Sequence, residues 1–149
     1  MNTHFQFHPG QSGFSLVEVI AVLIILGMLA MVVTAGMDSN ASAVAESEIL
    51  KAHLGYAQSL AFANNTATWS LQIMANSYSL LRDGLPSPVR LPGESSTVHL
   101  LPPDVTIAQG VGSLSFDQYG APTSTYVVVL SRGTFQESVT VTGFTGLIP

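Results

Sequence analysis

Residues 14–37 read FSLVEVIAVLIILGMLAMVVTAGM, and Glu18 is the only charged residue among these 24. As an α-helix the stretch would be roughly 36 Å long, which is enough to cross a hydrocarbon core of about 30 Å. It contains no proline, and its many Leu, Ile, Met and Ala residues support a helix. The sequence therefore predicts a membrane-spanning helix over residues 14–37.

A secretory signal peptide is the main alternative interpretation of this segment. It would need a basic region, a shorter apolar run and a small-residue cleavage site at the far end. The run here is longer, and its end offers only Val33-Thr34-Ala35 as a faint cleavage site. A core helix that is apolar on every side would also be unusual in so small a domain. The membrane-spanning helix is therefore favoured over both alternatives.

A pattern of residue types marks the start of the apolar segment. Gly13 is followed by Phe14, a small hydroxyl residue, two apolar residues and then Glu18. A glycine before a scissile bond lets a protease approach the backbone closely. An acid costs roughly 2.5–3.5 kcal/mol at a membrane centre, so it is a functional candidate with a partner to find. The alternative is a glutamate that merely reaches toward the membrane interface.

The residues Gly13-Phe14-Ser15-Leu16-Val17-Glu18-Val19-Ile20 resemble the cleavage and methylation motif of type IV prepilins. The resemblance implies that a prepilin peptidase cuts after Gly13 on the cytoplasmic face and methylates the new amine of Phe14. It also implies that Glu18 of one subunit meets the amine of an adjacent subunit, which sets the axial register of a filament. If Gly13 and Glu18 were coincidental, the chain would be a plain anchored domain.

Residues 1–13 would then be the prepilin leader peptide. Leaders of this family usually carry Lys or Arg, whereas this one has only His4 and His8. The positive-inside signal is weak as a result, and the orientation rests on the motif. The resemblance implies a single-pass protein of the bacterial inner membrane, with its head in the periplasm or in the assembled filament.

After Met37 the composition becomes polar, and residues 41–65 again have helical spacing. One face of this segment carries Leu50, Leu54, Ala57 and Ala61. Another face carries most of the charges, namely Glu46, Glu48 and Lys51. We expect residues 38–65 to form the soluble half of one long N-terminal helix, capped by polar residues near 38–40, packed on a sheet and ending near Asn64-Asn65.

Residues 66–149 show β-strand signals and predict a β-rich globular head. A hairpin is predicted from residues 66–74 and 77–81, around Ala75-Asn76. Further strands are predicted at residues 98–101, 105–107, 114–116, 126–130 and 138–142. The apolar run 126–130 suggests a strand covered on both faces, and Val139 and Val141 should point inward. The predicted fold class is α+β, a type IV pilin-like helix packed on an antiparallel sheet.

Looser motifs in the head resemble a subclass of this family. They are residues 56–65, 101–107, 114–120, and 130–133 followed by 139–141. They resemble segments of the H-class minor pseudopilins of type II secretion and of minor pilins of the FimT and FimU type. The resemblance implies a structural subunit for protein transport, whose partners are other pilin or pseudopilin subunits, prepilin peptidase and an inner-membrane assembly platform. The alternative is a minor pilin of a type IV pilus, in assembly initiation, adhesion or DNA uptake.

Other functions have little support in the sequence. The net charge is −5 with four Lys and Arg residues, so nucleic acid is not an expected partner. The chain has no cysteine. His53 and His99 lie far apart in the sequence without nearby paired acids, which predicts core or surface histidines rather than metal ligands. Residues 110–113 (GVGS) lack the third glycine of a dinucleotide loop and predict an ordinary loop. We expect no enzymatic activity, cofactor or metal.

Overall fold

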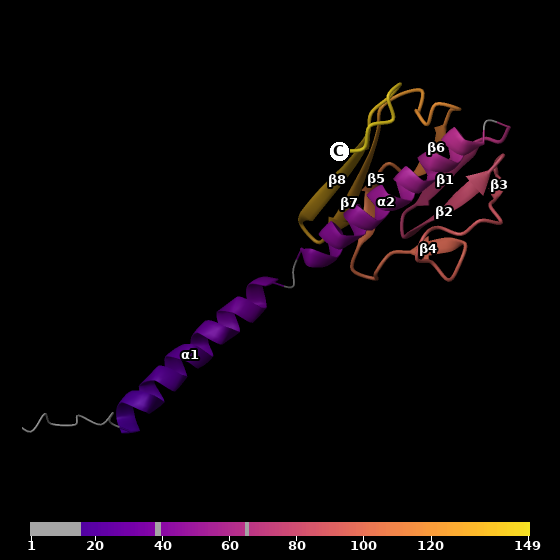
Figure 1. The fold of residues 1–149 in the computed structure, drawn as a ribbon. Helices are drawn as coiled ribbons and strands as arrows, with labels where there is room; N and C mark the ends of the chain where they lie inside the picture. Colours follow the sequence, from indigo (N-terminus) through magenta and orange to yellow (C-terminus); the bar gives the residue numbers. More distant parts are fainter. Residues whose placement is uncertain (1–15, 38–39, 65) are drawn as a thin grey trace, which may run out of the picture. The chain divides into compact units, whose positions relative to one another are not determined.

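The computed structural model describes residues 16–37, 40–64 and 66–149, and for residues 28–37 it describes the backbone helix only. The chain divides into two compact units, residues 1–37 and residues 38–149. Figure 1 shows the elements of both. Each unit is described by itself below.

The first unit contains helix α1, Leu16–Met37. The observed helix agrees with the helix-forming composition and the absence of proline in this segment. In the part of the chain that the structure describes, no helix is both long enough and apolar enough to cross a membrane. The span predicted over residues 14–37 includes residues 14–15 and the side chains of residues 28–37, which lie outside the description.

Helix α2, Ala41–Ala63, opens the second unit. Asn40 is the N-cap residue, and its carbonyl accepts the Val44 N–H at 3.2 Å, but its side chain makes no capping hydrogen bond. The helix ends where predicted, because Asn64 adopts an extended conformation and donates its N–H to the Leu60 carbonyl at 3.0 Å. The prediction that one helix runs through residues 38–39 falls outside the described residues.

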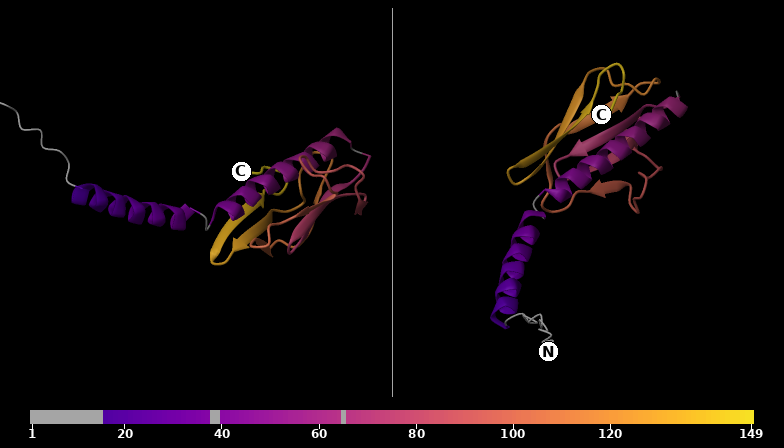
Figure 2. Two further views of the ribbon diagram at one scale, coloured as in Figure 1. Left: turned by 90° about the horizontal axis from the view of Figure 1, so that it is seen from below. Right: turned by 60° about the vertical axis from the view of Figure 1, so that its left-hand side comes forward.

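The predicted apolar face of α2 is confirmed. Its four members, Leu50, Leu54, Ala57 and Ala61, are all buried. They share one face because residues spaced by three and four positions lie above one another on a helix. Through this face α2 packs on strands of both sheets described below, as the views in Figure 2 show.

The larger sheet has five antiparallel strands in the order β3-β2-β1-β6, with β4 also paired to β2. Their bounds are Trp69–Met74 (β1), Ser77–Arg82 (β2), Leu85–Pro86 (β3), Val98–Leu100 (β4) and Gly112–Phe116 (β6). The predicted hairpin is confirmed, since Met74 pairs with Ser77 around the two-residue turn. Strand β3 is not among the predicted strands. Its Pro86 is tolerated because the strand lies at the edge of the sheet.

The smaller sheet has three antiparallel strands in the order β5-β7-β8. They span Thr106–Gln109 (β5), Tyr126–Arg132 (β7) and Phe135–Val141 (β8). Val139 and Val141 are fully buried, as predicted. Strand β7 buries Val128 and Leu130 completely, whereas Val127 and Val129 are only half-buried. Its second face is therefore covered less than the apolar run predicts.

The segment Gly110–Ser113 is only partly the loop that the sequence predicts, because β6 begins at Gly112. Gly110 has a φ of +86°, and a Cβ atom there would lie 2.4 Å from the Val127 carbonyl oxygen. Both the backbone conformation and the close approach require glycine at this position. The glycine here thus serves the connection between the two sheets rather than a phosphate.

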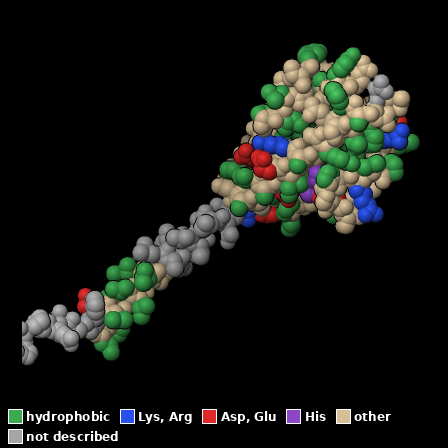
Figure 3. Space-filling view, viewed as in Figure 1, with side chains coloured by type: hydrophobic (Ala, Val, Ile, Leu, Met, Phe, Trp, Pro, Cys, Tyr) green, Lys and Arg blue, Asp and Glu red, His purple; other side chains and the backbone are tan. Residues whose placement is uncertain are grey.

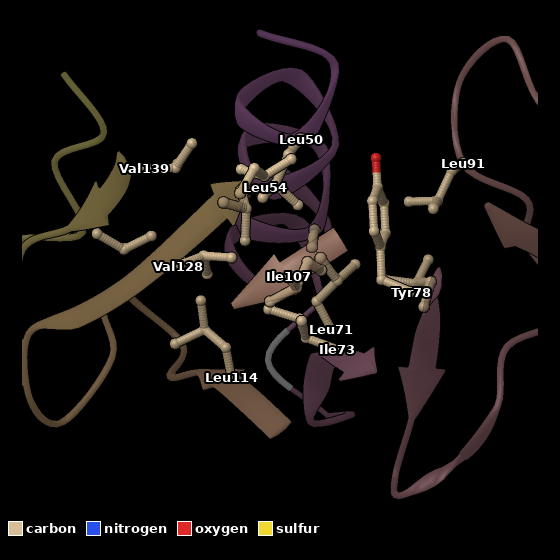
Figure 4. Close-up of a cluster of buried hydrophobic side chains, with 14 of the residues drawn as sticks. Leu50, Leu54, Leu71, Ile73, Tyr78, Leu91, Ile107, Leu114, Val128 and Val139 are labelled. Carbon is tan, nitrogen blue, oxygen red and sulfur yellow. The ribbon is translucent and has the colours of Figure 1, made fainter. Parts of the chain in front are cut away.

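The hydrophobic core of the second unit lies between α2 and the two sheets. Figure 4 shows Leu50 and Leu54 of α2 among residues of six strands and one loop, namely Leu71, Ile73, Tyr78, Leu91, Ile107, Leu114, Val128 and Val139. The core draws on both sheets, so the helix holds the two sheets together.

Leu54→Ala is expected to lower the free energy of unfolding of the head by about 2–5 kcal/mol, because it removes a fully buried side chain and leaves a cavity. Denaturant unfolding followed by Trp69 fluorescence measures this, since Trp69 is the single tryptophan of the chain and is buried. Leu85→Ala is the matched control. Leu85 is 68% exposed, so its loss should change stability by less than about 0.5 kcal/mol.

Candidate functional site

The first candidate site is the start of α1. Glu18 lies in the first turn of the helix and is exposed. Backbone N–H groups at a helix start have no partner within the helix, and the helix dipole favours a carboxylate there. With Val19, Val22 and Leu23, Glu18 borders a shallow, mostly apolar groove on the helix surface. Gly13 and Phe14, the predicted cleavage and methylation residues, lie outside the described residues.

Apart from Glu18, the described side chains of α1 are exposed and apolar around the helix. Leu16, Val17 and Leu23 are 76%, 73% and 62% exposed. They occur at consecutive as well as spaced positions, so they do not form a single stripe. In Figure 3 hydrophobic side chains cover much of the visible side of the described part of α1. A contiguous apolar surface of this kind indicates contact with lipid or with other apolar helices.

In the second unit, polar contacts fix the start of α2. The carboxylate of Asp104 accepts a hydrogen bond from Ser42 Oγ at 3.1 Å and another from Arg132 Nε of β7. Desolvation pushes the pKa of Asp104 up, but hydrogen bonds from its own backbone N–H, Ser42 and Arg132 outweigh it and leave the pKa below its usual value. The contact joins α2, the β4–β5 loop and β7 at the surface.

A second polar contact fixes the C-terminal tail to α2. Gln58 donates from its amide nitrogen to the carbonyls of Gly120 at 2.7 Å and Gly146 at 3.0 Å. Gly146 has a φ of +66°, and a Cβ there would lie 2.3 Å from the Gly120 carbonyl oxygen. A shallow open groove lies between the tail and the exposed face of α2. The groove carries a Glu48–Lys51 ion pair of 3.0 Å, and its lining residues form no reactive arrangement of side chains.

The structure brings together two histidines that lie far apart in the sequence. The rings of His53 on α2 and His99 on β4 are 5.5 Å apart, and both are buried. His99 also contacts two acids, Glu46 and Glu94. Paired acids therefore do lie beside His99, contrary to what the sequence predicts. Both histidines are core residues, which was one of the two alternatives.

The assignment of Glu46 to the charged face of its helix is also wrong. Its side chain is buried and bonded to His99. The sequence contains a signal for this, because Glu46 precedes Leu50 by four residues and His53 by seven. These spacings put all three on the buried face. Within the described residues, no group of three or more His, Asp or Glu is arranged to hold a metal ion.

Comparisons with known proteins agree with this arrangement. Residues 8–34 match the prokaryotic N-terminal methylation motif. No curated protein sequence matches the chain significantly. Two crystal structures of the type IV minor pilin FimU from Pseudomonas aeruginosa are similar in fold. One has a TM-score of 0.53 and 16% identity, covering 72% of this chain and 86% of FimU. The other has a TM-score of 0.51 and 17% identity, covering 69% and 87%.

At this level of identity the likeness to FimU shows the fold. The chain therefore carries a prepilin-type methylation motif and has an α+β head with the fold of a type IV pilin. The resemblance that the sequence suggests at Gly13–Ile20, and the fold class expected from it, are both confirmed.

Proposed function

We propose that this protein is a structural subunit of a pilus-like filament, cut after Gly13 and methylated at Phe14. The observation that carries the proposal is the presence of two features on one chain. The methylation motif over residues 8–34 precedes a head with the type IV pilin fold. Among the residues that the structure describes, we find no arrangement of side chains that suggests an enzyme.

In the proposed mechanism, residues 14–37 first span the bacterial inner membrane with the head in the periplasm. The support is the sequence, which has one charge among these 24 residues. An assembly platform then extracts the helix from lipid into a bundle of similar helices. Lipid tails and neighbouring helices are equally apolar, so this step gains little hydrophobic free energy. Close packing and the pairing of Glu18 with a Phe14 amine would supply the specificity.

The filament we favour is the pseudopilus of a type II secretion system, in which this chain would be a minor subunit of the H class. The loose motifs of the head support this assignment. Its partners would be the other pseudopilins, prepilin peptidase and the assembly platform. The alternative is a minor pilin of a type IV pilus, which the likeness to FimU favours because FimU is itself a type IV minor pilin.

DNA capture is the least supported role of a minor pilin for this chain. The chain has four Lys and Arg residues in all. Three of them lie near carboxylates, in the pairs Lys51–Glu48, Arg82–Asp83 and Arg132–Asp104. Binding to a phosphate backbone depends on Lys and Arg that neutralise phosphates. The charge distribution therefore supports a filament subunit over a nucleic-acid binder.

Processing is tested by co-expressing the full chain with a prepilin peptidase and measuring the intact mass. We expect the loss of residues 1–13 and the gain of one methyl group on the amine of Phe14. Chains expressed without the peptidase should keep residues 1–13. A mature chain that begins at any residue other than Phe14 would contradict the proposal.

The two filament systems are separated by a second experiment. The chain is expressed beside a complete secretion pseudopilus system or beside a complete type IV pilus system, and filaments are sheared from the cells. We expect the chain in the pseudopilus fraction. Its recovery only with type IV pili would support the alternative, and its absence from both fractions would contradict a filament role.

A further inference from the structure

A network of buried and partly buried titratable side chains links α2 to β4. His99 lies opposite Tyr78 of β2 in the strand register, and their rings stack at 4.6 Å. The Nε2 atom of His99 is 2.9 Å from Glu46 Oε2, and its Nδ1 atom is 2.6 Å from Glu94 Oε1. His99 and Glu46 are 7% and 8% exposed, so the contact between them is shielded from water, whereas the Glu94 side chain is partly exposed.

This arrangement requires a proton that ordinary ionisation would not supply. A neutral imidazole carries one N–H, and an ionised carboxylate can only accept hydrogen bonds. Two ring nitrogens within hydrogen-bond distance of two carboxylates therefore need a second hydrogen between them. The trio of Glu46, His99 and Glu94 holds one proton more than a neutral histidine beside two carboxylates would hold. In such a coupled group the proton belongs to the trio rather than to one residue.

The neighbouring His53 does not need this extra proton. Its Nε2 atom is 2.9 Å from the Pro92 carbonyl, which can only accept, so Nε2 carries the hydrogen. Its Nδ1 atom is 2.9 Å from the Tyr78 hydroxyl. Burial raises the pKa of Tyr78 far above its usual value, and the charges of Glu46 and Glu94 raise it further. Tyr78 therefore keeps its hydrogen and can donate it to Nδ1, so the two contacts of His53 need only one ring hydrogen.

The trio joins α2, which carries Glu46, to β4, which carries His99, and to the loop before β4, which carries Glu94. Two further titratable groups face it, namely His53 of α2 and Tyr78 of β2. The cation of α2, Lys51, is paired with the exposed carboxylate of Glu48. The extra proton of the trio thus offsets part of the negative charge of Glu46 and Glu94.

We infer that Glu46, His99 and Glu94 form a proton-dependent clasp, which holds the β4 segment (residues 91–100) against α2. The rest of this segment has few anchors. Strand β4 is three residues long and pairs with β2, while Val98 and Leu100 beside His99 are exposed. The buried Leu91 and the bond from His53 to the Pro92 carbonyl hold its beginning.

The clasp predicts that the β4 segment opens as the pH rises. When the segment opens, His99 and both acids enter water, where imidazole loses its proton near about pH 6.5. Above that pH the open form binds one proton fewer than the closed form. The stability of the closed form then falls with pH, and the opening constant rises by up to about tenfold per pH unit. Below that pH the closed form keeps its full stability relative to the open form.

Hydrogen exchange of the full chain in detergent micelles tests this, between about pH 6 and about pH 8.5. Protection factors, corrected for the intrinsic pH dependence of exchange, are compared for the β4 segment and for β7. We expect the protection of the β4 segment to fall by more than about tenfold over this range while β7 changes little. Protection of the β4 segment that does not change with pH would overturn the inference.

Glu94→Gln separates a proton-dependent clasp from a merely structural one. In this variant a neutral His99 can donate from Nε2 to Glu46 and accept the new side-chain amide at Nδ1, so the extra proton is no longer needed. We expect this variant to lose the pH dependence and to be better protected than the natural chain at the alkaline end. If the trio had only a structural role, Glu94→Gln would instead lower the protection of the β4 segment at every pH.

Glu48→Gln is the matched control, because it removes an exposed carboxylate from the same helix. It should keep the pH dependence of the natural chain. His53→Gln gives a second check, since the contacts of His53 need no extra proton. This variant is expected to lower protection but to keep the pH slope. A pH slope that disappears with His53→Gln and persists in Glu94→Gln would contradict the assignment.

Discussion

Gly13→Val is expected to keep the chain at full length when a prepilin peptidase is present. Gly13 precedes the proposed scissile bond, where an unbranched residue lets the enzyme reach the backbone. Valine adds a β-branched side chain that restricts the backbone and fills this space. We expect cleavage to slow by more than about a hundredfold, which corresponds to about 2.7 kcal/mol in activation free energy. The measurement is the ratio of full-length to mature chain by intact mass over time.

Ser12→Val is the matched control, because it places the same side chain one residue earlier in the leader. Its cleavage should stay close to that of the natural chain. Trp69 fluorescence checks that the head remains folded in both variants, since Trp69 is buried there. Cleavage of Gly13→Val at the normal rate would show that Gly13 is not the processing residue.

Glu18→Ala is expected to be cut normally and yet to be nearly absent from sheared filaments. In the proposed filament its carboxylate pairs with a Phe14 amine among apolar helices. Removing one partner of a buried ion pair leaves the other charge uncompensated, at a cost of about 3–5 kcal/mol. We expect incorporation to fall by more than about a hundredfold on this basis. Quantitative immunoblotting of sheared filaments against the membrane fraction measures it.

Two further variants show whether the charge or the side chain matters. Glu18→Gln keeps the size of the side chain and removes its charge, so it should resemble Glu18→Ala. Glu48→Ala removes an exposed carboxylate in the head and should incorporate normally. Normal incorporation of Glu18→Ala would remove the ion pair from the assembly mechanism, although processing after Gly13 could still stand.

The parts of the fold that were predicted correctly have signals within a few residues. The buried face of α2 follows from the spacing of Leu50, Leu54, Ala57 and Ala61, and the hairpin of β1 and β2 follows from two short runs around a two-residue turn. Strand β3 was missed because two residues give no periodicity. The separation of the strands into two sheets was not predicted either, because pairings such as that of β4 with β2 join segments distant in the sequence.

Some of the candidate site residues could be found from the sequence, and others come together only in the fold. Gly13, Phe14 and Glu18 form a contiguous motif, so the sequence alone could select them. The trio of Glu46, Glu94 and His99 could not be found by spacing, because its members come from a helix, a loop and a strand. Only the place of Glu46 four residues before Leu50 indicated that it points into the core. A charged residue is usually exposed, and that expectation outweighed the spacing.

A helix that is apolar on every side can rotate about its own axis, in lipid or among other apolar helices, with almost no change in free energy. The described side chains of α1 have this character apart from Glu18. One such N-terminal helix can therefore replace another. These helices alone cannot decide the order of subunits in a filament that contains several kinds of subunit. Sorting would then fall to the heads. The place of this chain in the filament would then be set by the surface of its head and not by its apolar N-terminal helix.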